Sequence, residues 1–155
     1  WTTQSSTPDG DIRVTTAHGP NTGAYHVTMA KYKVVGYNTN ELKLHLDLAG
    51  EEALMLNFSW KDINDEPDTQ DGVYISDDAG VNYTKIFSFT GNVSTYQDVS
   101  LMLSDLIDAN GLTHSSNFII KFQQYDNYPL TTDGIAIDDI CCSKFLTQIH
   151  HRKED

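Results

Sequence analysis

The sequence lacks long apolar segments, is poor in basic residues and contains only two cysteines. No apolar run approaches the roughly 18 residues that a membrane-spanning helix needs. Ten lysines and arginines stand against 22 aspartates and glutamates, which gives a formal net charge of -12. A surface this acidic repels phosphate backbones, so the composition excludes nucleic acid as a partner and favours cations and neutral polymers.

The two cysteines, Cys141 and Cys142, are neighbours in the sequence and cannot build a disulfide framework. A bridge between adjacent cysteines is strained and rare. We therefore expect two buried or half-buried thiols, with a bridge to another segment or a metal role as alternatives. The chain has no C-x-x-C motif, which disfavours a zinc site.

The length of 155 residues and the hydrophobic content of 39% are typical of one globular domain. We assign residues 1–145 to this domain and expect the polar tail, residues 146–155, to fray. The start "WTTQSSTPDG" is typical of a segment from a longer protein. The lack of a signal peptide therefore says nothing against secretion, and covalently linked neighbouring domains are expected.

Alternation of apolar and polar residues dominates the chain. In residues 41–48, Leu42, Leu44 and Leu46 share one face while Lys43 and His45 share the other. Such alternation predicts half-buried strands with one wet face. Further strands are expected in residues 24–30, 53–62, 83–89, 96–103, 117–126 and 133–140, and at Val73 and Ile75 within residues 71–80, where a turn follows. About eight strands at this spacing predict an all-β fold, an antiparallel two-sheet β-sandwich.

One short helix is expected at residues 104–111, with Ser104 as its N-cap and Gly111 just past its end. The pair Asp-Gly occurs three times, at residues 9–10, 71–72 and 133–134, and each copy opens an alternating run. Because the sequences that follow do not match one another, we interpret the three pairs as turns that enter strands rather than as a repeat.

An acidic loop follows the strand at residues 53–62. Calcium takes six to eight oxygen ligands, typically carboxylates and carbonyls on loops, and a loop this acidic repels itself unless a cation or solvent relieves it. In the last strand, alternation places Asp139 on the inner face beside Ile137, where an ionised carboxylate needs a partner. The alternatives are an acidic solvated loop and an Asp139 carboxylate that accepts backbone N–H bonds or pairs with Arg13 or a lysine. The expected calcium ligands are Asp62, Asp65, Asp71, Asp138 and Asp139.

Polar and aromatic side chains occupy the wet faces of several long strands. Tyrosine rings can stack on the C–H surface of a pyranose, and amides and ammonium groups can bond its hydroxyls. If these strands are neighbours, their wet faces form one polar surface suited to a sugar chain; ordinary exposure is the alternative for each residue. The expected contacts are Asn57, Lys61, Tyr74, Lys121, Gln123, Tyr125 and Tyr128.

Two segments that bracket the chain, "GPNTGAYHVTM" at residues 19–29 and "DGIAIDDI" at residues 133–140, resemble those of MAM-type and related bacterial jelly-roll modules. The central "DGVYISDDAGVNYTKIF" is similar to a segment of secreted bacterial modules. The paired cysteines of animal MAM domains are missing here, which favours a bacterial type. The resemblance implies a concanavalin-like jelly roll, often with a structural calcium, in a secreted or cell-surface protein that binds rather than catalyses.

Motifs of catalysis are absent from the sequence: no G-x-S-x-G, H-E-x-x-H or phosphate-binding loop occurs. The glutamates lie at strand ends or in loops, so no strand carries an evident pair for glycoside hydrolysis. We therefore expect no enzyme. The favoured hypothesis is a carbohydrate-binding module that targets a secreted enzyme to a polysaccharide. The alternative is a MAM-like adhesion module that binds proteins or cell-surface components.

Overall fold

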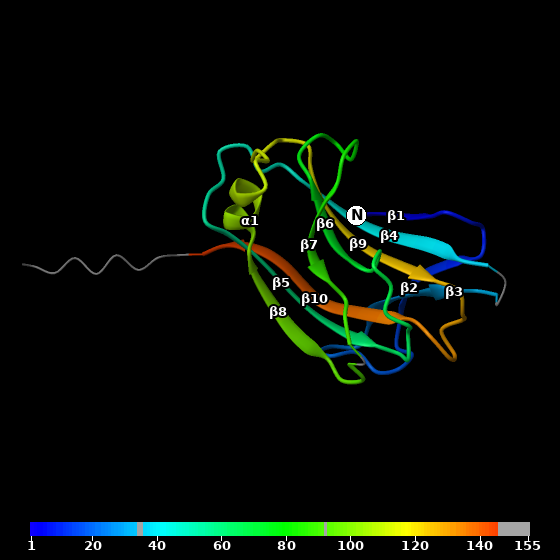
Figure 1. The fold of residues 1–155 in the computed structure, drawn as a ribbon. Coiled ribbons are helices and arrows are strands. Elements are labelled where there is room, and N and C mark those ends of the chain that lie inside the picture. The colour runs from blue at the N-terminus through cyan, green and yellow to red at the C-terminus, as the bar shows by residue number, and fades with distance from the viewer. Residues whose placement is uncertain (34–35, 92, 146–155) are drawn as a thin grey trace, which may run out of the picture.

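The computed structural model describes residues 1–33, 36–91 and 93–145, which form two five-stranded antiparallel sheets packed face to face (Figure 1). Sheet 1 has the order β1-β4-β9-β6-β7 and sheet 2 the order β2-β3-β10-β5-β8. The strands of sheet 1 are β1 (Thr2–Ser5), β4 (Asn38–Leu46), β9 (Phe118–Asp126), β6 (Gly72–Ser76) and β7 (Thr84–Ser88). Those of sheet 2 are β2 (Gly10–Thr15), β3 (His26–Lys31), β10 (Ile135–Lys144), β5 (Leu54–Asp62) and β8 (Gln97–Met102).

The core fills the space between the two sheets with the alternate residues of each strand. Phe122 of β9 and Phe58 of β5 meet edge to face, with ring centroids 5.3 Å apart. Trp60 is buried in the same cluster. The alternation predicted from the sequence therefore identifies the inner face of both sheets, and the predicted two-sheet all-β sandwich is confirmed.

Strand β1 was not predicted, because its four residues are polar or small and mostly exposed. It pairs with β4 at the edge of sheet 1, where Thr3 lies opposite Leu42. The strand is therefore held by ladder hydrogen bonds to β4 rather than by burial of an apolar face.

The helix α1 (Leu103–Ala109) connects β8 of sheet 2 to β9 of sheet 1 and lies at one end of the sandwich (Figure 1). Its expected N-cap is wrong: Met102 holds the cap position and Ser104 lies inside the helix. The Ser104 hydroxyl accepts a hydrogen bond from the Leu54 backbone N–H at 2.9 Å, so it fastens the helix to β5. Gly111 follows the helix in the left-handed region, at φ +67°, as expected.

The three Asp-Gly pairs enter strands, as the sequence predicts. Gly10 opens β2, Gly72 opens β6 and Gly134 immediately precedes β10. At each of them a side chain would collide with the fold. A Cβ on Gly134 would lie 2.7 Å from the Met29 carbonyl oxygen, and one on Gly72 would lie 2.1 Å from that of Phe87. Close backbone approach therefore requires glycine at Gly72 and Gly134, whereas at Gly10 the side chains of Ser5 and Asn40 leave no room for a Cβ.

Strand β10 contains an irregularity that the alternation did not reveal. Its register with β5 shifts between Asp138 and Cys141, and Asp139 has φ +52°. The bulge reverses the parity of the strand, so the expected inward position of Asp139 is wrong and this residue is exposed. Beyond the bulge, both cysteines are free thiols, with Cys141 exposed and Cys142 half-buried.

The predicted tail, residues 146–155, lies outside the described residues. Within the described part of the chain, no helix has the length and apolar character needed to cross a bilayer.

Candidate functional site

The outer face of sheet 1 brings together side chains from three adjacent central strands. In the register of the sheet, Lys121 of β9 lies between Lys43 of β4 and Tyr74 of β6, and Gln123 lies opposite Glu41. Because side chains alternate along a strand, all of these point away from the core. The face runs along β9 from Ile119 to Tyr125, a span of about 20 Å at the rise of an antiparallel strand.

Lys121 is the centre of this face. Its ammonium lies 2.9 Å from a Glu41 oxygen and donates to the Gln123 side-chain oxygen at 2.7 Å. It also lies 4.8 Å from the centroid of the Tyr74 ring and 4.1 Å from that of the Tyr83 ring. Lys121 is therefore only 6% exposed although no strand or helix covers it, because the tyrosine rings do.

Glu41 is the acidic counterpart of two lysines. Lys43 lies 2.6 Å from one of its oxygens while Lys121 holds the other. Burial opposes ionisation of this carboxyl, but the hydrogen bonds from Lys121 and Lys43 outweigh it, so the pKa of Glu41 is lowered. Lys43 also donates to Gln4 of β1 at 2.8 Å, which extends the network to the sheet edge.

Aromatic rings also define one end of the face. Tyr37, in the segment before β4, stacks on Tyr125 with ring centroids 4.8 Å apart. Gln70, in the β5–β6 loop, accepts hydrogen bonds at its carbonyl from Gln123 and from the Tyr74 hydroxyl, each at 2.9 Å. We call this surface the tyrosine face and define it by Tyr37, Tyr74, Tyr83 and Tyr125.

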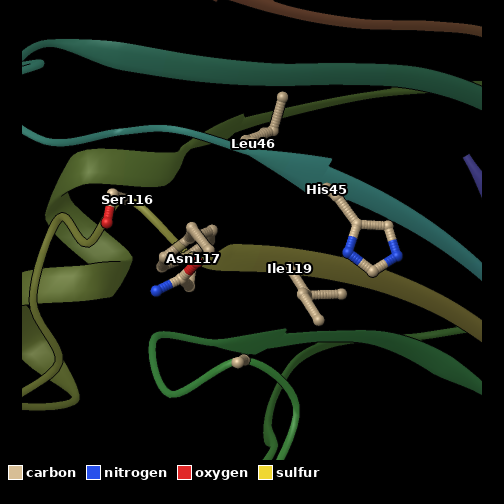
Figure 2. A pocket seen from close by; sticks show the side chains of 7 residues that line it. His45, Leu46, Ser116, Asn117 and Ile119 are labelled. Atoms are coloured by element: carbon tan, nitrogen blue, oxygen red, sulfur yellow. The ribbon is translucent and has the colours of Figure 1, made fainter.

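The opposite end of the same face is hollowed. A cavity of about 440 Å³ is lined by His45 of β4 and Ile119 of β9, which are partners in the sheet, together with the turn at Ala79 and residues 116–118 (Figure 2). Thr2 of β1 contacts the His45 ring at 2.8 Å. The tyrosine face thus continues into a concave polar and apolar pocket rather than ending at flat solvent.

Four of the predicted ligand-binding residues meet on this face: Tyr74, Lys121, Gln123 and Tyr125. Two of them are less accessible than predicted, because Lys121 and Gln123 are 6% and 7% exposed. Tyr37 and Tyr83 were missed. Tyr37 lies in the segment before β4, whose course the sequence does not reveal, and Tyr83, at the start of the strand expected at residues 83–89, was not assigned to the binding surface. Tyr128 lies beyond the end of β9, and its carbonyl accepts the Lys31 backbone N–H of sheet 2.

Asn57 and Lys61 do not lie on the tyrosine face, so the expected neighbourhood of their strand is wrong. Both belong to β5, which pairs with β10 and β8 in sheet 2. The Asn57 side chain accepts a hydrogen bond from Ser100 of β8. Lys61 is buried beneath the 16–24 segment, where its ammonium donates to the carbonyl oxygens of His18 and Gly19. Alternation gives the face of a strand but not the sheet to which the strand belongs, which explains the error.

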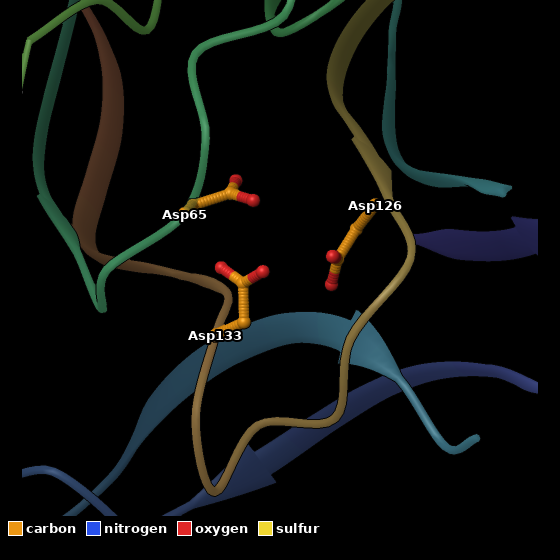
Figure 3. Close-up of side chains that lie close together, drawn as sticks. All are labelled: Asp65, Asp126 and Asp133. Atoms are coloured by element: carbon orange, nitrogen blue, oxygen red, sulfur yellow. The ribbon is translucent and has the colours of Figure 1, made fainter. Parts of the chain in front are cut away.

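An acidic cluster lies where the β5–β6 loop meets the two ends of the β9–β10 connection. It consists of Asp65, Asp126 and Asp133 (Figure 3). One carboxylate oxygen from each residue lies within 4.8 Å of the corresponding oxygens of the other two. Asp126 and Asp133 are buried; Asp65 is partly exposed as a residue, but its carboxylate is enclosed. The arrangement is suited to a hard cation.

Of the five predicted calcium ligands, one belongs to this cluster. This residue is Asp65. The two carboxylate oxygens of Asp71 instead accept the backbone N–H groups of Tyr125 and Asp68. Asp62 accepts the Asp65 backbone N–H at 2.6 Å. Asp126 and Asp133 were not predicted as members of a cluster, although Asp126 ends β9 and Asp133 lies just before β10.

Asp138 and Asp139 lie in a different place, so the expectation that they join the acidic loop is wrong. Asp138 accepts the backbone N–H groups of Asn21 and Thr22, and Asp139 accepts the side chains of the same two residues. The paired carboxylates therefore fasten the bulge of β10 to the segment before β3. The partner that the Asp139 carboxylate was expected to need is therefore supplied by hydrogen bonds from Asn21 and Thr22.

Burial is the main cause of the raised pKa values of the carboxyl groups in and near the cluster. Desolvation, with repulsion from neighbouring aspartates, raises the pKa of Asp65 and of Asp133. Burial also raises the pKa of Asp126, and it raises that of nearby Asp71 to about 6 despite two backbone hydrogen bonds. Negative charge at this position is therefore costly unless a proton or a cation compensates it.

Comparisons with known proteins give structural matches only. No family model matches the sequence, and no curated protein matches it. A family 30 carbohydrate-binding module of a cellulosomal cellulase of Clostridium thermocellum superposes with a TM-score of 0.62 at 18% identity, over 92% of this chain and 90% of that one. A family 61 module, solved with β-1,4-galactotriose, gives a TM-score of 0.57 at 12% identity, over 94% and 88%.

A third similar structure is a family 11 module of Clostridium thermocellum, solved with a β-1,3-1,4-mixed-linked tetrasaccharide. It has a TM-score of 0.52 at 17% identity and covers 90% of this chain and 86% of that module. Matches at such low identity establish shared architecture and nothing finer. The chain therefore has the β-sandwich fold that is also found in these carbohydrate-binding modules.

Proposed function

We propose that this chain is a non-catalytic carbohydrate-binding module that holds a polysaccharide across the tyrosine face. The observation that carries the proposal is the set of rings from Tyr37, Tyr74, Tyr83 and Tyr125 on the outer face of one open sheet, with charged and amide groups fixed between them. Aromatic faces stack on the C–H surfaces of sugar rings, and fixed polar groups bond their hydroxyls.

The network beneath the rings supports this assignment. Lys121 and Gln123 are almost inaccessible to solvent, and the Lys121 ammonium donates a hydrogen bond to the Gln123 side chain. The same ammonium lies against the Tyr74 and Tyr83 rings. In this proposal they position the tyrosines, while the rings and the partly exposed Glu41 and Lys43 meet the sugar. A surface already ordered in this way loses less conformational entropy on binding, which favours affinity.

The same face offers little for hydrolysis. Glycoside hydrolysis uses a pair of carboxyl groups on either side of the bond. Among the strand residues of this face that the structure describes, Glu41 is the one carboxylate, and it is paired with both Lys43 and Lys121. A binding role without catalysis therefore fits the face better than an enzyme does.

We further propose that the module belongs to a secreted enzyme and targets it to its polysaccharide. The three similar structures are modules of this architecture, and one belongs to a cellulosomal cellulase. The net charge of -12 favours a neutral polysaccharide over a sulfated one. Shallow sites of this kind leave little binding energy after ordering costs, so we expect a Kd of about 10⁻⁵ to 10⁻³ M.

The test is retention of the purified chain in native gels that contain a soluble polysaccharide. The first probes are β-1,4-galactan and mixed-linked β-glucan, followed by a glycan array. We expect Tyr125→Ala to weaken retention at least tenfold, because it removes one ring of the stacked pair. Tyr25→Ala is the matched control, since Tyr25 is an exposed tyrosine that lies just before β3 of sheet 2.

Two results would overturn the proposal. The first is an absence of binding to any glycan class on the array, which would favour the adhesion hypothesis. The second is equal retention of Tyr125→Ala and the unmodified chain at unchanged melting temperature, which would move the binding surface away from the tyrosine face.

A further inference from the structure

We propose that Asp65, Asp126 and Asp133 bind one calcium ion, and that this ion braces the β5–β6 loop against the tyrosine face. The bracing of the tyrosine face rests on the function proposed above, whereas the calcium site rests on the cluster alone. The three carboxylates come from separate segments: the β5–β6 loop, the end of β9 and the turn that enters β10. A shared ion would therefore tie three parts of the chain together.

The spacing of the three carboxylates lies in the range that a calcium site requires. Calcium binds oxygen at about 2.3–2.6 Å, so two ligand oxygens on opposite sides of one ion lie roughly 5 Å apart. The three oxygens of the cluster all lie within 4.8 Å of one another. Figure 3 shows the three side chains directed toward a common centre. Carbonyl oxygens and water would complete a coordination number of six to eight.

A second observation points independently to a ligand. Asp126 is 1% exposed, and its Oδ2 atom is buried without a hydrogen-bond partner among the described residues. Its other oxygen, Oδ1, accepts the backbone N–H groups of Asn127 and Tyr128. The side chain is thus held through Oδ1, while Oδ2 faces the cluster and has no hydrogen-bond partner among the described residues. A buried carboxylate oxygen in this state is costly unless a cation or a proton occupies the site.

In the described part of the chain, no lysine or arginine makes an ion pair with Asp65, Asp126 or Asp133. Among the residues that the structure describes, the side-chain donor that reaches the cluster is the Gln124 amide, which lies 3.2 Å from an Asp65 oxygen. Three carboxylates and one neutral donor leave a net negative site, which attracts a divalent cation.

The loop that carries Asp65 also shapes the tyrosine face. At its far end, Asp71 accepts the Tyr125 backbone N–H at 2.7 Å, and the Gln70 carbonyl accepts from both Gln123 and Tyr74. Asp126 directly follows Tyr125 in β9. An ion bound at the cluster would therefore fix both the loop and the strand end that position the tyrosines.

The first experiment measures calcium binding in the absence of any sugar. Metal-free protein is titrated with calcium by calorimetry, and its melting temperature is compared in calcium and in chelator. We expect one ion per chain and a melting temperature at least 5 °C higher in calcium, because the ion binds the folded state alone. Stoichiometric calcium without stabilisation, or no calcium binding at all, overturns the site.

Variants locate the ion. Asp126→Asn keeps the size of the side chain but removes its charge, and we expect it to weaken calcium binding at least tenfold. Asp138→Asn is the matched control, because Asp138 belongs to the other acidic pair. If Asp126→Asn does not fold, Asp133→Asn replaces it. A shared proton is the rival explanation: it predicts no effect of calcium and a higher melting temperature for Asp126→Asn, a result that overturns the proposal.

The second experiment repeats the polysaccharide gels in calcium and in chelator. We expect at least fivefold weaker retention in chelator, and the same loss for Asp126→Asn in calcium. If calcium binds but retention is unchanged, the bracing role is wrong. If calcium binds and no glycan is retained in either condition, the proposed function fails while the cation site stands.

Discussion

Tyr37 and Tyr125 stack almost in parallel, with 4° between their ring planes and 4.8 Å between their centroids. The two residues are 88 positions apart in the sequence, but Thr39 of β4 lies opposite Tyr125 of β9, which brings the segment before β4 over the Tyr125 ring. Tyr37 is 57% exposed, so the outer surface of its ring remains open to solvent. The pair offers one broad aromatic surface rather than two separate rings.

The stacked pair should show measurable coupling in stability. Aromatic pairs contribute about 0.5–1.5 kcal/mol beyond the area that they bury. We expect a double-mutant cycle of Tyr37→Ala and Tyr125→Ala, followed by urea unfolding, to give a coupling free energy of about 0.5–1 kcal/mol. A cycle of Tyr32→Ala with Tyr125→Ala is the control and should be additive. Additivity in both cycles would mean that the stack is not populated in solution.

Lys61 should prove structural rather than ligand-binding. Lys61→Met leaves the His18 and Gly19 carbonyls without their donor beneath the 16–24 segment and removes the cation 4.6 Å from the centroid of the Tyr96 ring. An acceptor left without a donor and shielded from water costs about 1–3 kcal/mol, so we expect a loss of about 2–4 kcal/mol in the free energy of unfolding.

Lys33→Met is the control for this substitution, because Lys33 forms a surface pair with Asp9 at 3.1 Å and such pairs contribute at most about 1 kcal/mol. Glycan retention of folded Lys61→Met should equal that of the unmodified chain. A stability loss no larger than that of Lys33→Met would show that solvent satisfies the two carbonyls.

Asp71 should make the metal-free protein less stable as the pH rises. Its folded pKa is about 6, above the ordinary value of 3.8, so between these values the folded state binds more protons than the unfolded state. The linkage relation then lowers the free energy of unfolding from about pH 4 to about pH 6, by at most about 3 kcal/mol. Above pH 6 the contribution of Asp71 is constant.

Urea unfolding in chelator at several pH values from 4.5 to 7.5 measures this slope. Asp71→Asn should flatten it, even if the variant is less stable overall because an amide cannot accept both the Tyr125 and the Asp68 N–H groups. The difference between protein and variant isolates Asp71 from the other raised aspartates. Identical slopes would show that Asp71 is ionised throughout this range.

The two adjacent thiols should react at different rates. Cys141 is exposed, whereas Cys142 is half-buried and burial raises the pKa of its thiol. Because the thiolate is the reactive form, iodoacetamide should modify Cys141 at least several-fold faster than Cys142 in the folded protein. Peptide mass spectrometry distinguishes the sites. In urea both should react, and protection of both under non-reducing conditions would reveal a bridge.

Local patterns predicted the strands well and the site only in part. The alternation in residues 117–126 correctly placed Phe122 inward and Lys121 outward, because burial of one face is a local property of a strand. The same pattern placed Lys61 on an outer face, also correctly, but could not tell that β5 belongs to sheet 2. Membership of a sheet depends on long-range pairing, which periodicity does not encode.

The acidic cluster also depends on long-range contacts that local sequence patterns do not encode. Asp65 was identified from the density of charge in its own loop, whereas Asp126 and Asp133 are single carboxylates beside strand ends. Asp126 ends β9 in sheet 1 and Asp133 precedes β10 in sheet 2, so only the packing of the two sheets brings them to Asp65. The bulge in β10 misled the prediction for Asp139, because one extra residue reverses every later position.

The β5–β6 loop restricts how this module can be altered by insertion. Its residues contact the acidic cluster through Asp65, the Tyr125 backbone through Asp71, and the Gln123 and Tyr74 side chains through Gln70. Extra residues within 65–71 would disturb several of these contacts at once. The turn around Gly50, in contrast, offers open space beside its backbone. Peptide tags, labels or fused domains placed there should leave folding and ligand capture intact, which makes that turn the natural point for engineering.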